Sequence, residues 1–150
     1  MIELEFKQRP IDVPSDLRLY RRLSMLCISL SVCCRGGSAS FKQLHFINAL
    51  MLDPKFYNLY AGFKKHKSTL KILCPSADPY LNRCVNYALG SDLIRQKKVQ
   101  NSFKVELSDK GKDFVVSLKN EELAADVFGL CESIGKISDK EVNTLLKTED

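Results

Sequence analysis

Six cysteines and two histidines are the candidate metal ligands and nucleophiles of this chain. The cysteines are Cys27, Cys33, Cys34, Cys74, Cys84 and Cys131. None belongs to a Cys-x-x-Cys pair, and His45 and His66 stand in no paired spacing with them. Because two close ligand pairs usually hold a structural zinc ion, this spacing does not indicate a metal site. We expect reduced thiols that serve mainly as small buried apolar side chains.

Catalytic motifs are absent from the sequence as well. The chain has no G-x-x-x-x-G-K-[ST] loop, so we expect no ATP binding through a P-loop. The RGGS segment at 35–38 is better explained as a helix end and turn than as a phosphate cradle. His45 lies next to Phe46 on a predicted helix, which favours a packed or capping imidazole over a general base. With no convergent nucleophile, base or carboxylate pair, we expect a protein that is not an enzyme and uses no cofactor.

Basic and amide side chains in the middle of the chain favour contact with nucleic acid instead. Lysines would mainly neutralise phosphates, whereas Arg and Asn side chains can also read base edges. The candidate DNA or phosphate contacts are Lys64, Lys65, Lys67, Asn82, Arg83, Asn86, Arg95, Lys97, Lys98 and Lys104. The lysines of 64–67 end a predicted helix, where positive charge also suits the helix dipole alone, so both interpretations stay open.

The charge is unevenly distributed along the 150 residues. There are 23 Lys and Arg against 18 Asp and Glu, a net charge of +5. Residues 64–112 hold eleven basic and four acidic residues, whereas residues 113–150 hold four basic and nine acidic ones. A hydrophobic content of 45% with few Gly and Pro is typical of one globular domain. The longest uncharged stretch, twelve residues, is too short for a membrane span, and no secretory signal is evident, so we expect a cytoplasmic protein.

Hydrophobic spacing and capping signals predict several helices around one hairpin. Residues 1–14 begin with alternating apolar and charged side chains and then reach Pro10 and Pro14, which predicts an N-terminal arm or edge strand. The predicted helices cover 15–35, 40–52, 53–67, 78–90, 108–118, 122–134 and the residues after 138, the predicted hairpin covers 93–107, and 70–74 has strand character. The mostly apolar stretch 23–34 indicates the central helix, with a buried strand as the alternative.

The order of these elements predicts a mainly α fold with a small β-hairpin: a winged helix-turn-helix core plus C-terminal helices. The helix at 78–90 would be the recognition helix and the hairpin the wing. We expect an arm at 1–14, the winged-helix domain at 15–120 and acidic C-terminal helices at 121–150. Apolar residues in those final helices exceed the needs of a small core, which makes them candidates for docking on a basic partner surface. They are Val127, Phe128, Leu130, Ile134, Val142, Leu145 and Leu146.

Weakly specific motifs along most of the chain resemble a known bacterial family. They comprise Arg9-Pro10, an Arg- and Leu-rich helix at 17–23, the break at Gly36-Gly37, a Leu-His-apolar-apolar-Asn helix at 44–48 and a Leu-Ser-Asp-Lys-Gly hairpin exit at 107–111. In combination they resemble the middle component of three-component ABC-ATPase systems, the class that includes Lamassu-type antiphage defence.

The resemblance implies a non-catalytic accessory subunit. Its partners would be an SMC-like or ABC ATPase and a nuclease effector, which it would bridge or restrain, with double-stranded DNA as a further candidate partner and no membrane. For the wing, protein docking and DNA contact both stay open. The alternative is a winged-helix transcriptional regulator, which predicts a homodimer that protects a paired operator.

Overall fold

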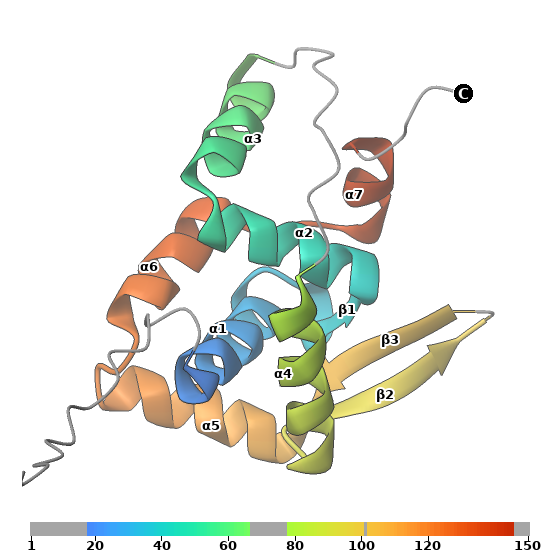
Figure 1. Ribbon diagram of the computed structural model, residues 1–150, viewed down its shortest axis with the longest axis vertical. Coiled ribbons are helices and arrows are strands. Elements are labelled where there is room, and N and C mark those ends of the chain that lie inside the picture. Colours follow the sequence, from blue (N-terminus) through green and yellow to red (C-terminus); the bar gives the residue numbers. More distant parts are fainter. Residues whose placement is uncertain (1–17, 67–77, 101, 146–150) are drawn as a thin grey trace, which may run out of the picture.

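The computed structural model describes residues 18–66, 78–100 and 102–145 (Figure 1). The elements are α1 (Leu19–Val32), the 3-10 turn η2 (Arg35–Gly37), β1 (Ser38–Ser40), α2 (Phe41–Leu52), α3 (Pro54–His66), α4 (Pro79–Gly90), β2 (Ile94–Val99), β3 (Ser102–Leu107), α5 (Asp109–Asn120), α6 (Ala125–Ile134) and α7 (Asp139–Leu145). The predicted arm at 1–14, the apolar run at 70–74, Lys67 and Leu146 lie outside the described residues. The mainly α fold with a small β-hairpin is confirmed.

Helix α1 is the central element, as its apolar sequence predicts. Every residue from Arg22 to Leu30 is buried, and α4, α5 and α6 pack around the helix (Figure 1). Its buried serines are satisfied within the helix: Ser24 Oγ donates to the carbonyl of Tyr20 and Ser29 Oγ to that of Leu26, each at 2.8 Å. These hydrogen bonds remove the cost of burying the hydroxyls. The buried-strand alternative for 23–34 is therefore wrong.

Helix α1 ends three residues earlier than its sequence predicts. The last helical residue is Val32, and Cys34 already has extended backbone angles. The following turn needs positive φ at Gly36 (65°) and Gly37 (66°), a conformation that glycine adopts without strain. The RGGS segment is thus a turn, as expected, and it leads directly into β1.

Local capping signals place the starts of α2, α4 and α5. Ser40 Oγ accepts from the amide of Gln43 at 3.2 Å, and the Ser40 amide donates back to Gln43 Oε1 at 2.9 Å, which confirms the predicted capping box. Asp78 caps α4 by accepting from the Tyr80 amide at 3.0 Å. Ser108 caps α5. By contrast, α6 begins at Ala125 and not at residue 122, because the turn before it is left-handed at 122 and 124.

The sheet has a third strand that the hairpin pattern did not predict. Its order is β1-β3-β2, all antiparallel, with Ala39 opposite Val105 in the core and Ser40 opposite Lys104. Three residues are too few to show an alternating pattern, so only pairing with β3 reveals β1. The hairpin β2-β3 projects from the helical body beside α4, whereas α3 leaves the body at the far end (Figure 1).

The C-terminal helices pack against the same core. Gln43 Nε2 donates to the carbonyl of Ile137 at 3.1 Å, and the Ile137 amide donates to the carbonyl of Cys33 at 2.9 Å. The Tyr60 hydroxyl donates to Glu141 Oε1 at 3.1 Å, which links α3 to α7. These contacts span 81 to 104 positions and join the C-terminal segment to the first half of the chain.

Candidate nucleic-acid interface

The predicted recognition helix α4 presents a polar face to solvent. Asn82, Arg83 and Asn86 are all exposed, and they lie within about one helical turn of one another. The opposite side of the helix is buried and consists of Leu81, Cys84, Val85 and Ala88. Because this spacing is that of one helix face, the three candidate contacts share a surface.

A network at the N-terminus of α4 fixes the position of this face. Asp78 accepts hydrogen bonds from Arg22 of α1 and, at 3.0 Å, from Asn48 Nδ2 of α2. Burial by itself raises the pKa of Asp78, but the hydrogen bonds from Arg22 and Asn48, the positive charge of Arg22 and the Tyr80 amide outweigh it and hold the pKa below its usual value. The ionised carboxylate therefore ties three helices together.

Two tyrosines on α4 join the candidate contacts. Tyr80 is 44% and Tyr87 51% exposed. The Arg83 guanidinium lies over the Tyr80 ring, 5.7 Å from its centroid. Helical spacing alone could have indicated this exposure, since positions 80 and 87 fall outside the stripe of buried residues on α4. Exposed aromatic rings beside an arginine suit contact with bases or with another protein.

The wing carries its basic side chains on two different faces. Residues opposite each other in an antiparallel pair point to the same side of the sheet. Arg95 stands opposite Glu106, and Lys97 stands opposite Lys104. Lys98 lies on the other face of the hairpin, opposite Phe103. Lys97 Nζ is 3.8 Å from Glu106 Oε2, so one carboxylate partly offsets three cations on that face. The pairing register therefore separates Lys98 from the other three predicted contacts.

The other face of the wing ends in an exposed aromatic residue. Phe103 stands opposite Lys98 and is 53% exposed. Nearer the body, the same face is buried at Ile94 and Leu107. The sequence analysis did not single out Phe103, because alternation of apolar and polar residues does not show where a strand leaves the core.

Of the predicted contacts at the end of α3, Lys64 has a partner elsewhere in the chain. Lys64 Nζ donates to the carbonyl of Ile134 at 3.3 Å and lies 5.4 Å from the centroid of the Tyr60 ring. Ile134 is the last residue of α6, so the ammonium group meets the negative end of that helix dipole. Lys64 therefore has a structural partner, and α3 lies away from the hairpin (Figure 1). The Lys65 side chain and Lys67 lie outside the described part of the chain.

The predicted docking residues of the C-terminal helices need a correction. Val127, Ile134, Val142 and Leu145 are buried in the chain's own core, and Phe128 and Leu130 are half-buried against it. The four buried side chains are thus not on the surface where a partner could dock. The prediction was wrong for these four residues because α1, α2 and α3 leave apolar surface that α6 and α7 cover.

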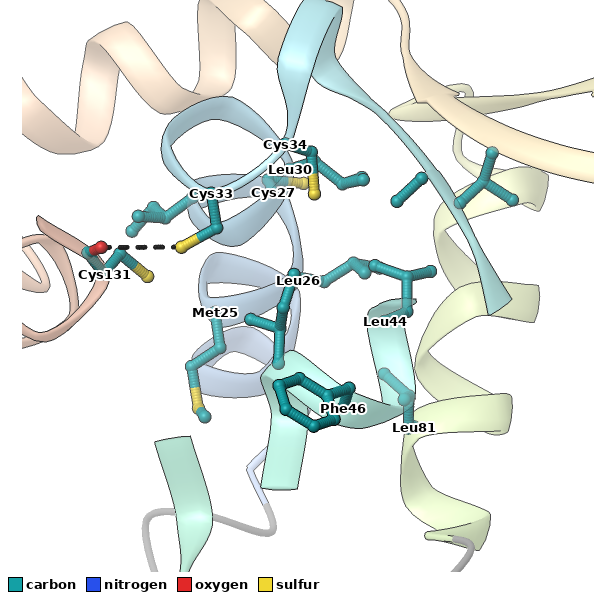
Figure 2. Close-up of a cluster of buried hydrophobic side chains, with 14 of the residues drawn as sticks. Met25, Leu26, Cys27, Leu30, Cys33, Cys34, Leu44, Phe46, Leu81 and Cys131 are labelled. Atoms are coloured by element: carbon teal, nitrogen blue, oxygen red, sulfur yellow. Dashed lines mark hydrogen bonds between the residues drawn. The ribbon is translucent and has the colours of Figure 1, made fainter. Parts of the chain in front are cut away.

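The described cysteines are buried and unbridged, as expected. Figure 2 shows Cys33 directed from the end of α1 towards Cys131, and Cys33 Sγ lies 3.5 Å from the Cys131 carbonyl oxygen. Burial raises the pKa of Cys27 to about 12 and that of Cys84 to about 11. Within the described ranges, no group of three or more His, Cys, Asp and Glu side chains could hold a metal ion.

Comparisons add no relative that would assign a function. Comparison with protein-family models, with curated proteins and with solved structures finds no match to this chain. In the part of the chain that the structure describes, no helix is both long enough and apolar enough to cross a membrane.

Proposed function

We propose that the chain is a non-catalytic accessory subunit of a cytoplasmic antiviral defence complex that contains an SMC-like ATPase and a nuclease effector. It bridges or restrains the effector and contacts double-stranded DNA through α4 and the wing. The observation that carries the DNA contact is the exposed Asn82-Arg83-Asn86 face next to a basic hairpin.

The position of α4 supports groove recognition. In a helix-turn-helix the recognition helix lies in the major groove, and a basic hairpin beside it could neutralise neighbouring phosphates. Asp78 fixes the start of α4 to α1 and α2, so the polar face is held without a large ordering cost on binding. Arg83 can make bidentate contacts with guanine, and Asn82 or Asn86 with adenine.

The motifs of the resemblance support an accessory role because residues in two of them position helices and carry out no catalytic step. Asn48, from the Leu-His-apolar-apolar-Asn motif, donates to Asp78 and so helps to orient α4. Gly111, which ends the hairpin-exit motif, allows α5 to approach the backbone at Leu93. Residues in both motifs thus position the helix and the wing that would make the contacts.

Duplex binding by the full chain tests the DNA contact. We expect Arg95→Glu/Lys97→Glu to weaken binding and to reduce the slope of log K against log salt by about 2, since each lost phosphate contact removes about 0.9. The control Lys55→Glu/Lys119→Glu makes the same change in net charge on exposed residues of α3 and α5. Equal losses of duplex affinity in both double variants would contradict DNA contact through the wing.

Co-expression with the products of the adjacent genes tests the complex. Recovery of an ATPase or a nuclease with the full chain is the expected result. A chain that stays monomeric and recovers neither protein contradicts the accessory role. A homodimer that protects a paired operator would support a transcriptional regulator in its place.

A further inference from the structure

A groove between α5 and α6 offers apolar side chains to solvent. Its volume is about 400 Å³, and its apolar lining includes the exposed Leu123 of the connecting turn, the half-buried Phe128 of α6 and the buried Leu118 of α5. Leu123 is 42% exposed. A Cβ added at Gly129, which also lines the groove, would meet no atom within 4 Å, so there is free space at this point of α6.

Helix α6 has separate faces for the core and for this groove. The core face is buried and contains Val127, Cys131 and Ile134. The groove face contains Ala125, Phe128, Gly129 and Glu132, which follow the spacing i, i+3, i+4 and i+7 of one helical stripe. Packing against the core therefore holds the groove face in place, with Phe128 half-buried against the core and Ala125, Gly129 and Glu132 exposed.

The rim of the groove is acidic. Glu122 and Glu132 line it and are exposed, with Lys119 as the lining cation. From residue 119 to residue 132 the chain has four acidic residues and one basic residue, all exposed, and one of the four, Asp126, is paired with Arg21 of α1. An apolar floor with carboxylates at its edges complements a ligand that has an apolar stripe between basic side chains.

We infer that this groove docks a basic amphipathic helix of a partner protein, an inference that rests on the accessory role proposed above. The apolar side chains of such a helix would contact Leu123 and Phe128, while its Lys or Arg residues would approach Glu122 and Glu132. Figure 1 shows α6 and the end of α5 on one side of α1 and the hairpin on the other. DNA at the wing and a helix at the groove would therefore not compete for the same surface.

Peptide binding to the full chain tests the groove directly. The probe is a fluorescein-labelled peptide of about 15 residues with Leu at helical spacing and Lys elsewhere, long enough to form a helix. Two matched peptides replace every Lys with Glu or every Leu with Gln. We expect fluorescence anisotropy to detect binding of the Leu/Lys peptide and much weaker binding of the other two. If the Gln peptide binds as tightly as the Leu/Lys peptide, the attraction is purely electrostatic and the inference fails.

Two variants with matched controls locate the binding site. Gly129→Leu fills the groove, and Glu132→Lys reverses the charge at its rim, so each should weaken Leu/Lys peptide binding by about tenfold or more. Gly62→Leu on α3, where an added Cβ also meets no atom within 4 Å, and Asp113→Lys outside the groove should leave it unchanged. Circular dichroism and thermal unfolding check that all four variants fold. Equal weakening by a variant and its control would overturn the inference.

The partner experiment separates this inference from the proposed function. If an ATPase or nuclease is recovered equally by the wild type and by Gly129→Leu, the accessory role stands and the groove inference fails. If the peptide binds at the groove but neither partner is recovered, the groove inference is supported and the proposed complex is contradicted.

Discussion

Gly111 lies where the first turn of α5 meets the chain that enters the wing, and Gly111→Ala tests that packing. An added Cβ would lie 2.1 Å from the carbonyl oxygen of Leu93 and 2.9 Å from Cδ2 of Leu107. That carbonyl already accepts from the Ser108 amide at 3.1 Å. The oxygen must therefore move by about 1 Å to reach an ordinary contact distance, and this movement strains or breaks the hydrogen bond.

Opposing effects set the size of the expected change. Replacing Gly with Ala inside a helix favours folding by about 1 kcal/mol. Overpacking costs about 1–3 kcal/mol, and loss of a buried hydrogen bond costs about 1–3 kcal/mol more. The sum predicts that Gly111→Ala lowers the free energy of unfolding by about 1–5 kcal/mol, against the helix propensity of alanine.

Urea unfolding followed by circular dichroism measures this change, with a constant m-value indicating an effect on stability alone. Gly129→Ala on α6 is the control, because its Cβ meets no atom within 4 Å. The control should gain up to about 1 kcal/mol from helix propensity. If Gly111→Ala were as stable as the control, the close approach of α5 to Leu93 would be refuted.

Three further predictions concern the core and its buried charges. Asp78→Asn leaves buried Arg22 without its carboxylate and should lower the free energy of unfolding by about 3 kcal/mol at pH 7. Because the folded-state pKa of Asp78 is depressed, its stabilisation is complete above the ordinary value of about 3.9 and is lost as the pH falls through the folded-state pKa. Stability curves of the two proteins should therefore converge in acid, and a constant difference down to pH 2 would contradict the ion pair. Ile134→Ala should cost about 2–5 kcal/mol in urea unfolding, whereas an unchanged midpoint would mean that α6 is not part of the core. Native Cys27 and Cys84, buried and with raised pKa values, should resist iodoacetamide at pH 8 until urea is added, as peptide mass spectrometry can show.

The candidate interface could be predicted from the sequence only where a single helix carried it. Asn82, Arg83 and Asn86 share a face because helical spacing alone determines it. The placement of Lys98 and Lys97 on opposite faces could be known only from the register between β2 and β3. A shift of one residue in that register would move every side chain of a strand to the other face. For Lys64 the sequence left a phosphate contact and a helix-dipole role open, because its partner, the end of α6, lies 70 residues away.

Local signals determined most of the elements of this fold. The caps at Ser40, Asp78 and Ser108 join residues two or three positions apart, so the sequence alone contains the whole interaction. The apolar run of α1 likewise requires burial wherever its neighbours lie. These features made the mainly α fold with its hairpin predictable.

Only the tertiary structure decided which surfaces stay free. Val142 and Phe128 are both apolar residues of the final helices. Val142 is fully buried in the core, whereas Phe128 lines the groove between α5 and α6. The pairing of Arg22 with Asp78 spans 56 residues and joins two helices that no local pattern relates. Burial depends on which distant element covers a side chain, and that information exists only after the helices have packed.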